Sequence, residues 1–277
     1  MEYVELICHT TAGVHTAELL MDVLADAGFD SFAENENGTI SAYIQDVLFT
    51  NDLVSRLKLP EFSVLLASYE IKRLADQNWN AIWESQYEPV LIDGICMVRA
   101  PFHEKMAGIG FDIVIMPKMS FGTAHHETTK QMIQYMLSLQ LEGKSLLDMG
   151  SGTAVLAILA RMKGAKPVSA IDNDEWAYNN ALENVQGNNF PDIEVLLGDS
   201  SLLTNKKYDV IFANINRNIL LNDIPTYRKC LNIGGKLFVS GFYTEDLPSI
   251  EAKANETGLT IMSNRVENNW TAACFTL

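Results

Sequence analysis

The chain has 277 residues, of which 48% are hydrophobic and 20% charged, and its formal net charge is −15. This length accommodates one large domain and a small one, and the acidic charge argues against a protein that binds nucleic acid through a basic face. No apolar run reaches the ~18 residues of a membrane span, and the N-terminus carries acids where a signal peptide carries lysines, which favours a cytoplasmic protein.

The four cysteines, Cys8, Cys96, Cys230 and Cys274, lie far apart and form no C-x-x-C pair. Isolated thiols of this kind are typical of buried, reduced side chains, and they do not predict a zinc cluster or a redox dithiol. We therefore expect no metal in this protein.

Residues 1–73 predict a small α/β domain. Its expected elements, in chain order, are a strand at 3–9, a helix at 16–27, strands at 29–34 and 39–44, a helix near 50–58 and a strand at 62–71. Gly28 is suited to end the first helix, and Asn37-Gly38 is a strong hairpin signal between the middle strands. The order β-α-β-β-α-β is that of a ferredoxin-like α+β domain, a fold that serves many functions.

Acidic residues are concentrated at this end of the chain. Residues 1–60 contain ten Asp and Glu against Arg56 and Lys58, a net −8, and the other 217 residues carry the remaining −7. The excess of acid either keeps the small domain soluble or docks a basic protein. Both interpretations remain open at the level of sequence.

Residues 74–90 form the expected connector between two domains. Trp79 and Trp83 are four residues apart and would share one helix face, where packing between domains is the simpler interpretation. Short strands are expected within 90–100 and 111–117, ahead of the larger domain.

Residues 91–277 predict a doubly wound catalytic domain. After residue 130, near-continuous apolar strands alternate with helices, which indicates a parallel sheet covered on both faces. The expected strands are 145–150, 167–172, 193–199, 208–215 and 235–242. A closing hairpin, 258–266 and 270–277, requires one antiparallel strand. We expect a seven-stranded, Rossmann-like mixed sheet.

The segment LLDMGSGTAVLAI (146–158) combines a strand, a glycine turn and a helix. Gly150 and Gly152 allow a sharp turn and a close approach of the backbone to a ligand. Asp148 ends this strand and Asp172 ends the next. Asp172 follows Gly152 by twenty residues, the spacing at which a carboxylate reaches ribose hydroxyls in doubly wound nucleotide sites. Val155 stands where a dinucleotide fingerprint has its third glycine or an alanine.

Carboxylates at these strand ends suit a ligand with an amino group and a sulfonium cation better than they suit a pyrophosphate. S-adenosylmethionine is such a ligand, and the closing hairpin fits methyltransferases better than dehydrogenases. Asp199 ends the third strand, within expected reach of an adenine ring, and Asn214 ends the fourth. Ligands of open α/β sheets bind beyond these carboxyl ends.

Four motifs, in this order, resemble the bacterial methyltransferases of large-subunit ribosomal protein eleven, a class I S-adenosylmethionine-dependent family. They are FGTAHHETT (121–129), LLDMGSGTAVLAI (146–158), AIDND (170–174) and FANI (212–215). The resemblance covers nearly the whole chain, including W-x-x-x-W-x-x-x-Y-x-P at 79–89, and the threonine-rich loop is its most specific motif.

The chain departs from that family in three places. The family motif at 121–129 is F-G-T-G-T-H-P-T-T. Here Ala124, His125 and Glu127 replace its second glycine, a threonine and the proline, so we expect the loop to be stiffer at 124 and freer at 127. Ser151 replaces the usual cysteine of the glycine loop. Asn216-Arg217 replace Leu-Ala on the expected substrate side.

The resemblance implies that Thr129, Gly150, Asp172 and Asn214 contact S-adenosylmethionine, and the residue pattern adds Gly152 and Asp199 to the same site. Thr128 and Gln131 fit a capping box at the start of the helix that follows the loop. Adjacent side chains on an extended loop point apart, so His125 and His126 are poor joint metal ligands. His126 is expected to order the loop, line the substrate channel or act as a base.

The resemblance further implies methylation of lysine side chains and of the N-terminal α-amine of a basic ribosomal protein. Reaching separate amines with one pocket requires the small domain to move relative to the catalytic one, and the two-domain pattern makes residues 74–90 the candidate hinge. The chemistry would be in-line displacement by a deprotonated amine that Asn214 orients. Another amine or small-molecule methyltransferase and a non-catalytic S-adenosylmethionine-binding protein remain alternatives, whereas the charge argues against a nucleic-acid methyltransferase. We expect a cytoplasmic monomer with no membrane or nucleic-acid partner.

Overall fold

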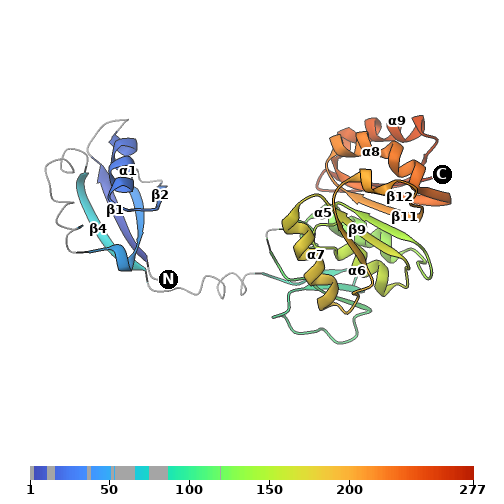
Figure 1. The fold of residues 1–277 in the computed structure, drawn as a ribbon, viewed down its shortest axis with the longest axis horizontal. Coiled ribbons are helices and arrows are strands. Elements are labelled where there is room, and N and C mark those ends of the chain that lie inside the picture. Colours follow the sequence, from blue (N-terminus) through green and yellow to red (C-terminus); the bar gives the residue numbers. More distant parts are fainter. Residues whose placement is uncertain are drawn as a thin grey trace. The chain divides into compact units, whose positions relative to one another are not determined.

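The computed structural model describes residues 3–10, 16–35, 39–50, 53, 66–74, 87–118 and 120–277 (Figure 1). The chain folds into two compact units, 1–86 and 87–277, each with its own apolar core. The division falls within the predicted connector, 74–90. Trp79 and Trp83 lie outside the described residues, as do the Asn37-Gly38 turn and most of the helix expected near 50–58.

The first unit contains one antiparallel sheet of four strands in the order β2-β3-β1-β4. Its elements are β1 (Tyr3–Thr10), α1 (Thr16–Asp26), β2 (Ser31–Glu34), β3 (Ile40–Gln45), the 3₁₀ turn η1 (Asp46–Leu48) and β4 (Leu66–Leu74). Leu20 and Leu24 of α1 are fully buried against Val4 and Leu6 of β1. Gly28 has φ +103°, a left-handed conformation suited to ending a helix.

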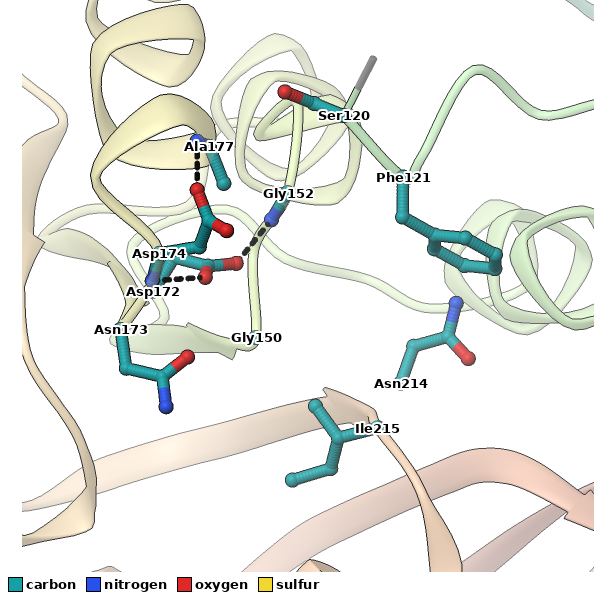
Figure 2. A pocket seen from close by; sticks show the side chains of 10 residues that line it. All are labelled: Ser120, Phe121, Gly150, Gly152, Asp172, Asn173, Asp174, Ala177, Asn214 and Ile215. Carbon is teal, nitrogen blue, oxygen red and sulfur yellow. Dashed lines mark hydrogen bonds between the residues drawn. The ribbon is translucent and has the colours of Figure 1, made fainter. Parts of the chain in front are cut away.

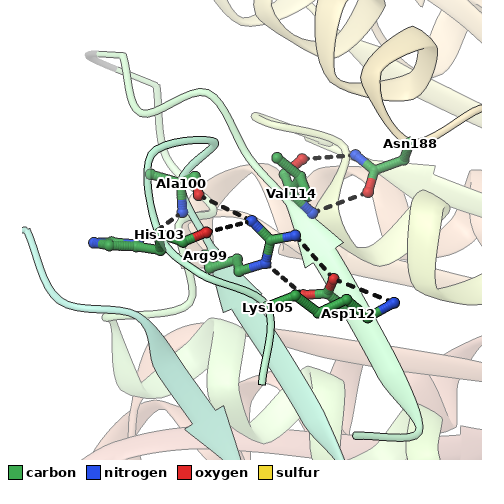
Figure 3. Close-up of polar contacts among 7 residues, drawn as sticks. All are labelled: Arg99, Ala100, His103, Lys105, Asp112, Val114 and Asn188. Carbon is green, nitrogen blue, oxygen red and sulfur yellow. Dashed lines mark hydrogen bonds and ion pairs between the residues drawn. The ribbon is translucent and has the colours of Figure 1, made fainter. Parts of the chain in front are cut away.

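The second unit begins with a small sheet of three strands, β5 (Val90–Ile92), β6 (Cys96–Arg99) and β7 (Phe111–Val114). Arg99 and Asp112, on neighbouring strands, form a bidentate ion pair with Nε–Oδ1 and Nη2–Oδ2 distances of 2.7 and 3.0 Å (Figure 3). Arg99 Nη1 also donates to the His103 carbonyl at 2.7 Å. One largely buried guanidinium thus ties both strands to the loop that connects them.

The main sheet has seven strands in the order β10-β9-β8-β11-β12-β14-β13. Its strands are β8 (Leu146–Met149), β9 (Val168–Asp172), β10 (Glu194–Leu197), β11 (Tyr208–Asn214), β12 (Leu231–Tyr243), β13 (Thr260–Glu267) and β14 (Trp270–Thr276). The helices are α5 (Glu127–Leu137), α6 (Val155–Met162), α7 (Glu175–Gly187), α8 (Arg217–Cys230) and α9 (Leu247–Glu256), with 3₁₀ turns η2 (Ser200–Leu203) and η3 (Thr244–Asp246).

Strands β8 to β12 pair with one another in parallel, whereas β14 runs antiparallel to both β12 and β13. The expected mixed α/β fold is confirmed. β12 begins at Leu231, four residues before the expected 235, because Leu231 already pairs with Tyr208 of β11.

Both faces of the main sheet are covered, as the continuous apolar strands predict. Successive residues of a strand point to opposite faces. Leu146 and Phe212 therefore lie in one core with α5, α6 and α7, while Leu147 and Ile211 lie in the other with α8 and α9. Because β8, β9, β10 and β11 run parallel, their carboxyl ends meet at one edge of the sheet.

The buried ion pair of the small sheet gives a stability prediction. Replacing Asp112 by alanine leaves the Arg99 guanidinium, whose side chain is 12% exposed, without its main partner. We expect the free energy of unfolding to fall by about 3 kcal/mol. Urea denaturation followed by circular dichroism measures the change. Lys105→Ala is the matched control, because Lys105 is 68% exposed and reaches Asp112 only at 3.9 Å. Equal losses in the two variants would contradict the prediction.

Candidate cofactor and acceptor site

A glycine turn joins β8 to α6 at the carboxyl edge of the sheet. Gly150 and Gly152 have φ of +69° and +52°, which L-residues rarely adopt. The Gly150 and Ser151 amides donate to the Ile171 carbonyl of β9 at 2.8 and 3.0 Å. The turn is therefore held flat against the neighbouring strand end.

The predicted threonine-rich loop packs over this turn. The Thr153 amide donates to the Phe121 carbonyl at 2.9 Å, and Thr153 Oγ1 donates to the Gly122 carbonyl at 2.6 Å. A Cβ at Gly152 would lie 2.2 Å from the Phe121 oxygen, and one at Gly150 would lie 2.1 Å from Ile215 Cγ2. The two glycines are thus required by close packing of protein segments.

A pocket of about 260 Å³ opens beside the turn (Figure 2). Four of the predicted site residues line it: Gly150, Gly152, Asp172 and Asn214. Six further lining residues were not singled out from sequence: Ser120, Phe121, Asn173, Asp174, Ala177 and Ile215. Phe121, Asn173, Asp174 and Ile215 belong to recognised motifs, and an Asp before a helix is also a capping signal, so these four carried a usable sequence signal.

Asp172 ends β9 at the centre of the pocket. Its Oδ2 accepts from the Gly152 amide at 2.8 Å, and its Oδ1 accepts from the Asp174 amide at 3.0 Å (Figure 2). A carboxylate has about four acceptor positions, so two backbone bonds leave capacity for ligand hydroxyls. The same bonds fix the orientation of the carboxylate before a ligand arrives.

Asn214, at the end of β11, faces the pocket from the opposite side (Figure 2). Its Nδ2 donates to Thr129 Oγ1 at 3.3 Å. Its Oδ1 is buried and has no hydrogen-bond partner among the described residues. Thr129 is itself 1% exposed and does not line the pocket, so the structure places it behind Asn214.

The capping box predicted for α5 is wrong. The N-cap is His126, whose Nδ1 accepts from the Thr128 amide at 3.3 Å and lies 2.9 Å from Thr128 Oγ1. Gln131 Nε2 instead donates to the Trp270 carbonyl at 3.0 Å. An Nδ1 that accepts the cap bond leaves the ring proton of a neutral imidazole on Nε2. This arrangement favours the loop-ordering role of His126 over the role of base.

The two histidines point to different partners. His125 Nε2 lies 2.9 Å from the Glu88 carbonyl and its Nδ1 lies 3.1 Å from Thr123 Oγ1. The His126 ring instead contacts Phe121 and Trp270, with centroids 5.1 and 4.7 Å away. Among the described residues, no group of three or more His, Cys, Asp or Glu is placed to hold a metal ion. Within the same residues, no helix is long and apolar enough to cross a membrane.

Asp148 does not line the pocket, although the sequence interpretation grouped it with the ligand-facing acids. It is 1% exposed, and its Oδ2 accepts from the Ala157 amide of α6 at 3.1 Å. Burial raises the pKa of Asp148 from its ordinary 3.8 to about 8, against the opposing effect of the Ala157 bond, and the Asp172 charge adds to the rise. Asp148 thus supports the first turn of α6 from below.

Asp199 follows β10 and caps η2, where its Oδ1 accepts from the Ser201 amide at 2.9 Å. It does not line the described pocket, so its predicted contact with an adenine ring stays a prediction.

Asn216 caps α8 through the Ile219 amide at 3.1 Å, and Arg217 Nε pairs with Asp246 Oδ1 at 3.1 Å. These two departures from the family motif therefore have structural partners of their own.

The strand order, the glycine turn after β8 and the acid at the end of β9 define an S-adenosylmethionine-dependent methyltransferase fold. A crystal structure of a methyltransferase from Pyrococcus furiosus shares the fold, with a TM-score of 0.51 and 20% identity over 59% of this chain and 88% of that one. A crystal structure of the ribosomal protein L11 methylase from Lactobacillus delbrueckii subsp. bulgaricus is more similar: its TM-score is 0.62, with 27% identity over 68% of this chain and 97% of that one.

The particular family follows from the sequence comparison. The model of the ribosomal protein L11 methyltransferase (PrmA) family matches residues 5–276. The ribosomal protein L11 methyltransferase of Bacteroides thetaiotaomicron is 44% identical in an alignment 283 positions long, which covers all of both chains. The chain belongs to the ribosomal protein L11 methyltransferase family.

The buried carboxyl of Asp148 gives a pH prediction. Between pH ~4 and about 8 the folded chain keeps a proton that the unfolded chain has lost, so this group lowers stability as pH rises through that window. The slope for one group is at most about 1.4 kcal/mol per pH unit. We expect Asp148→Asn, which removes the ionisation, to gain stability relative to wild type from pH 5 to 8.

Urea denaturation across that range, without ligand, measures the difference. Asp209→Asn is the control of opposite sign. Burial opposes ionisation of Asp209, but hydrogen bonds from Ser145 and Asn232 outweigh it and lower the pKa. At neutral pH the free energy of unfolding of Asp209→Asn should lie below that of wild type, and the difference should shrink as pH falls. A pH-independent difference between Asp148→Asn and wild type would sink the prediction.

Proposed function

We propose that this chain transfers methyl groups from S-adenosylmethionine to amines of a basic large-subunit ribosomal protein, at lysine side chains and at the N-terminal α-amine. The observation that carries the proposal is one pocket in which Asp172 and Asn214 face each other across the glycine turn, in a chain of the L11 methyltransferase family. The first residue is suited to hold the donor and the second to hold the acceptor.

The donor side is formed by Gly150, Gly152 and Asp172. The remaining acceptor capacity of the Asp172 carboxylate suits two ribose hydroxyls, since hydroxyls donate well to a charged oxygen. S-adenosylmethionine supplies a methyl group on a positively charged sulfur, and an acidic rim of Asp172 and Asp174 favours that cation. No phosphate-binding helix end is needed in this arrangement.

The acceptor side centres on Asn214. Because Thr129 holds the Nδ2 end of its amide, the Oδ1 end is directed away from Thr129 and accepts no hydrogen bond from any described residue. A carbonyl oxygen there accepts a hydrogen bond from an N–H of the incoming amine and so orients the nitrogen lone pair. Thr129, predicted to touch the cofactor, acts in this proposal through Asn214.

An aromatic row leads from the pocket across the surface of the catalytic unit. Successive ring centroids are 5.1 Å apart for Phe121 and His126, 4.7 Å for His126 and Trp270, and 4.2 Å for Trp270 and Tyr243. Phe121 and Tyr243 are 50% and 42% exposed. Aromatic faces attract ammonium groups, so this row suits a lysine side chain that arrives charged and, as desolvation lowers its pKa, releases its proton to water before transfer.

The first unit is suited to dock the protein substrate. Its strand order, β2-β3-β1-β4, supports a ferredoxin-like recognition domain over residues 1–73, and the net −8 of residues 1–60 complements a basic partner. Residues 74–90 would then act as the hinge between recognition and catalysis. This assignment makes the two units separable by experiment.

Replacing Asp172 tests the donor side. Asp172→Ala removes the carboxylate that accepts ribose hydroxyls and also frees the Gly152 amide. We expect cofactor affinity to fall by about 1.5–3 kcal/mol or more. Calorimetric titration with S-adenosylmethionine measures the loss. Asp192→Ala, at an ion pair with Arg161 that does not belong to the pocket lining, is the matched control. Unchanged affinity in Asp172→Ala would show that the cofactor pose is wrong.

Removing residues 1–73 tests the recognition domain. The catalytic unit keeps both of its own cores, so we expect it to bind S-adenosylmethionine with unchanged affinity and to lose methylation of the ribosomal protein. Mass spectrometry of unmethylated large-subunit proteins, incubated with the cofactor and with full-length or shortened chain, records added methyl groups. No added mass with the full-length chain would refute the proposed function. Equal methylation by both chains would refute the docking role alone.

A further inference from the structure

Helix α7 presents three asparagines at four-residue spacing: Asn180, Asn184 and Asn188. Residues spaced in this way lie on one face of a helix. Asn180 and Asn184 are only 1% and 2% exposed. Buried amides have a high desolvation cost, which hydrogen bonds must offset, so their partners show what this face is for.

The three side chains bind the backbone at and just beyond the end of β7. Asn188 accepts from the Val114 amide at 2.9 Å and donates to the Val114 carbonyl at 2.6 Å (Figure 3). Asn184 Oδ1 accepts from the Met116 amide at 2.8 Å, and Asn180 Nδ2 donates to the Met116 carbonyl at 3.3 Å. The amides thus pair with alternate residues, as a neighbouring strand would do.

Asn184 differs from Asn188 in the partner of its amide nitrogen: Asn188 Nδ2 donates to the Val114 and Asn184 carbonyls. Asn184 Nδ2 donates to the Thr153 carbonyl at 3.0 Å, inside the core. Thr153 follows Gly152 and is the residue whose amide and hydroxyl hold the Phe121 and Gly122 carbonyls. A single side-chain amide therefore joins the segment after β7 to the glycine turn.

We infer that Asn184 is a positioning residue for the cofactor pocket. Ser120 and Phe121 line one side of that pocket and Gly150 and Gly152 line another. Asn184 holds Met116, four residues before Ser120, at a fixed distance from Thr153. The inference rests on the proposed function, because the ligand whose binding it controls is S-adenosylmethionine.

The threonine-rich loop and the glycine turn have little room to move relative to each other. The Phe121 oxygen already lies where a Cβ on residue 152 would need to be, so the loop and the turn are in contact without spare room. Rotation of the Asn184 amide carries one of its two ends away from its partner, since both ends are engaged. A shift of either segment relative to the other changes the shape of the pocket directly.

The test compares Asn184→Ala with Asn188→Ala. Both variants remove a brace from the β7 segment, but only the first releases Thr153. We expect Asn184→Ala to bind S-adenosylmethionine about tenfold more weakly and Asn188→Ala to stay within about twofold of wild type. Calorimetric titration is carried out at the same interval below each variant's own melting temperature. The Michaelis constant for the cofactor should rise about tenfold in Asn184→Ala, while that for the protein acceptor stays the same.

A loss of stability alone would lower the amount of active enzyme and leave both Michaelis constants unchanged. Equal cofactor affinity in the two alanine variants overturns the inference. If Asn184→Ala does not fold, Asn184→Leu and Asn188→Leu replace the alanine pair, because leucine fills nearly the same space as asparagine and removes the side-chain hydrogen bonds. Equal cofactor affinity in the two leucine variants then overturns it. A wild-type chain that binds no S-adenosylmethionine instead refutes the proposed function itself.

Discussion

The site depends on the close contact between the threonine-rich loop and the glycine turn. Thr153 holds the loop through two hydrogen bonds, and Gly152 permits the approach because it has no Cβ. Every other part of the pocket is arranged around this contact. Asp172 binds the turn from β9, and Asn214, tied to Thr129 at the start of α5, completes the opposite wall. The glycines therefore serve protein packing first and ligand approach second.

Two aspartates beside this contact, Asp148 and Asp172, have different roles because one is buried and the other lines the pocket. Asp148 lies beneath the turn, without access to water, and burial raises its pKa to about 8. Asp172, twenty-four positions later, stands at the surface of the pocket with both oxygens bonded to backbone amides. A protonated buried carboxyl suits a structural support, whereas a fixed carboxylate suits recognition of hydroxyls or a cation.

Local patterns predicted the parts of the molecule that depend on local causes. Apolar strands and their polar ends located Gly150, Gly152, Asp172 and Asn214 at one edge, because parallel strands bring their carboxyl ends together. The helix cap was mistaken because a histidine nitrogen replaces the threonine oxygen that capping statistics favour. The burial of Asp148 and the partners of Asn184 could not be read from sequence, since both depend on segments that meet only in the folded chain.

The closing hairpin has a consequence at the rim of the main sheet. β13 pairs only with β14 in the described sheet, so it forms the outer border, and Ser263, Asn264 and Arg265 along it are exposed. Charged and polar side chains on a border strand discourage recruitment of a strand from another molecule. The apolar run of β14, Ala272 to Phe275, is shielded behind it. The hairpin thereby keeps the more apolar of the two closing strands inside the sheet and leaves β13, with its exposed polar residues and the exposed Met262 and Val266, at the border.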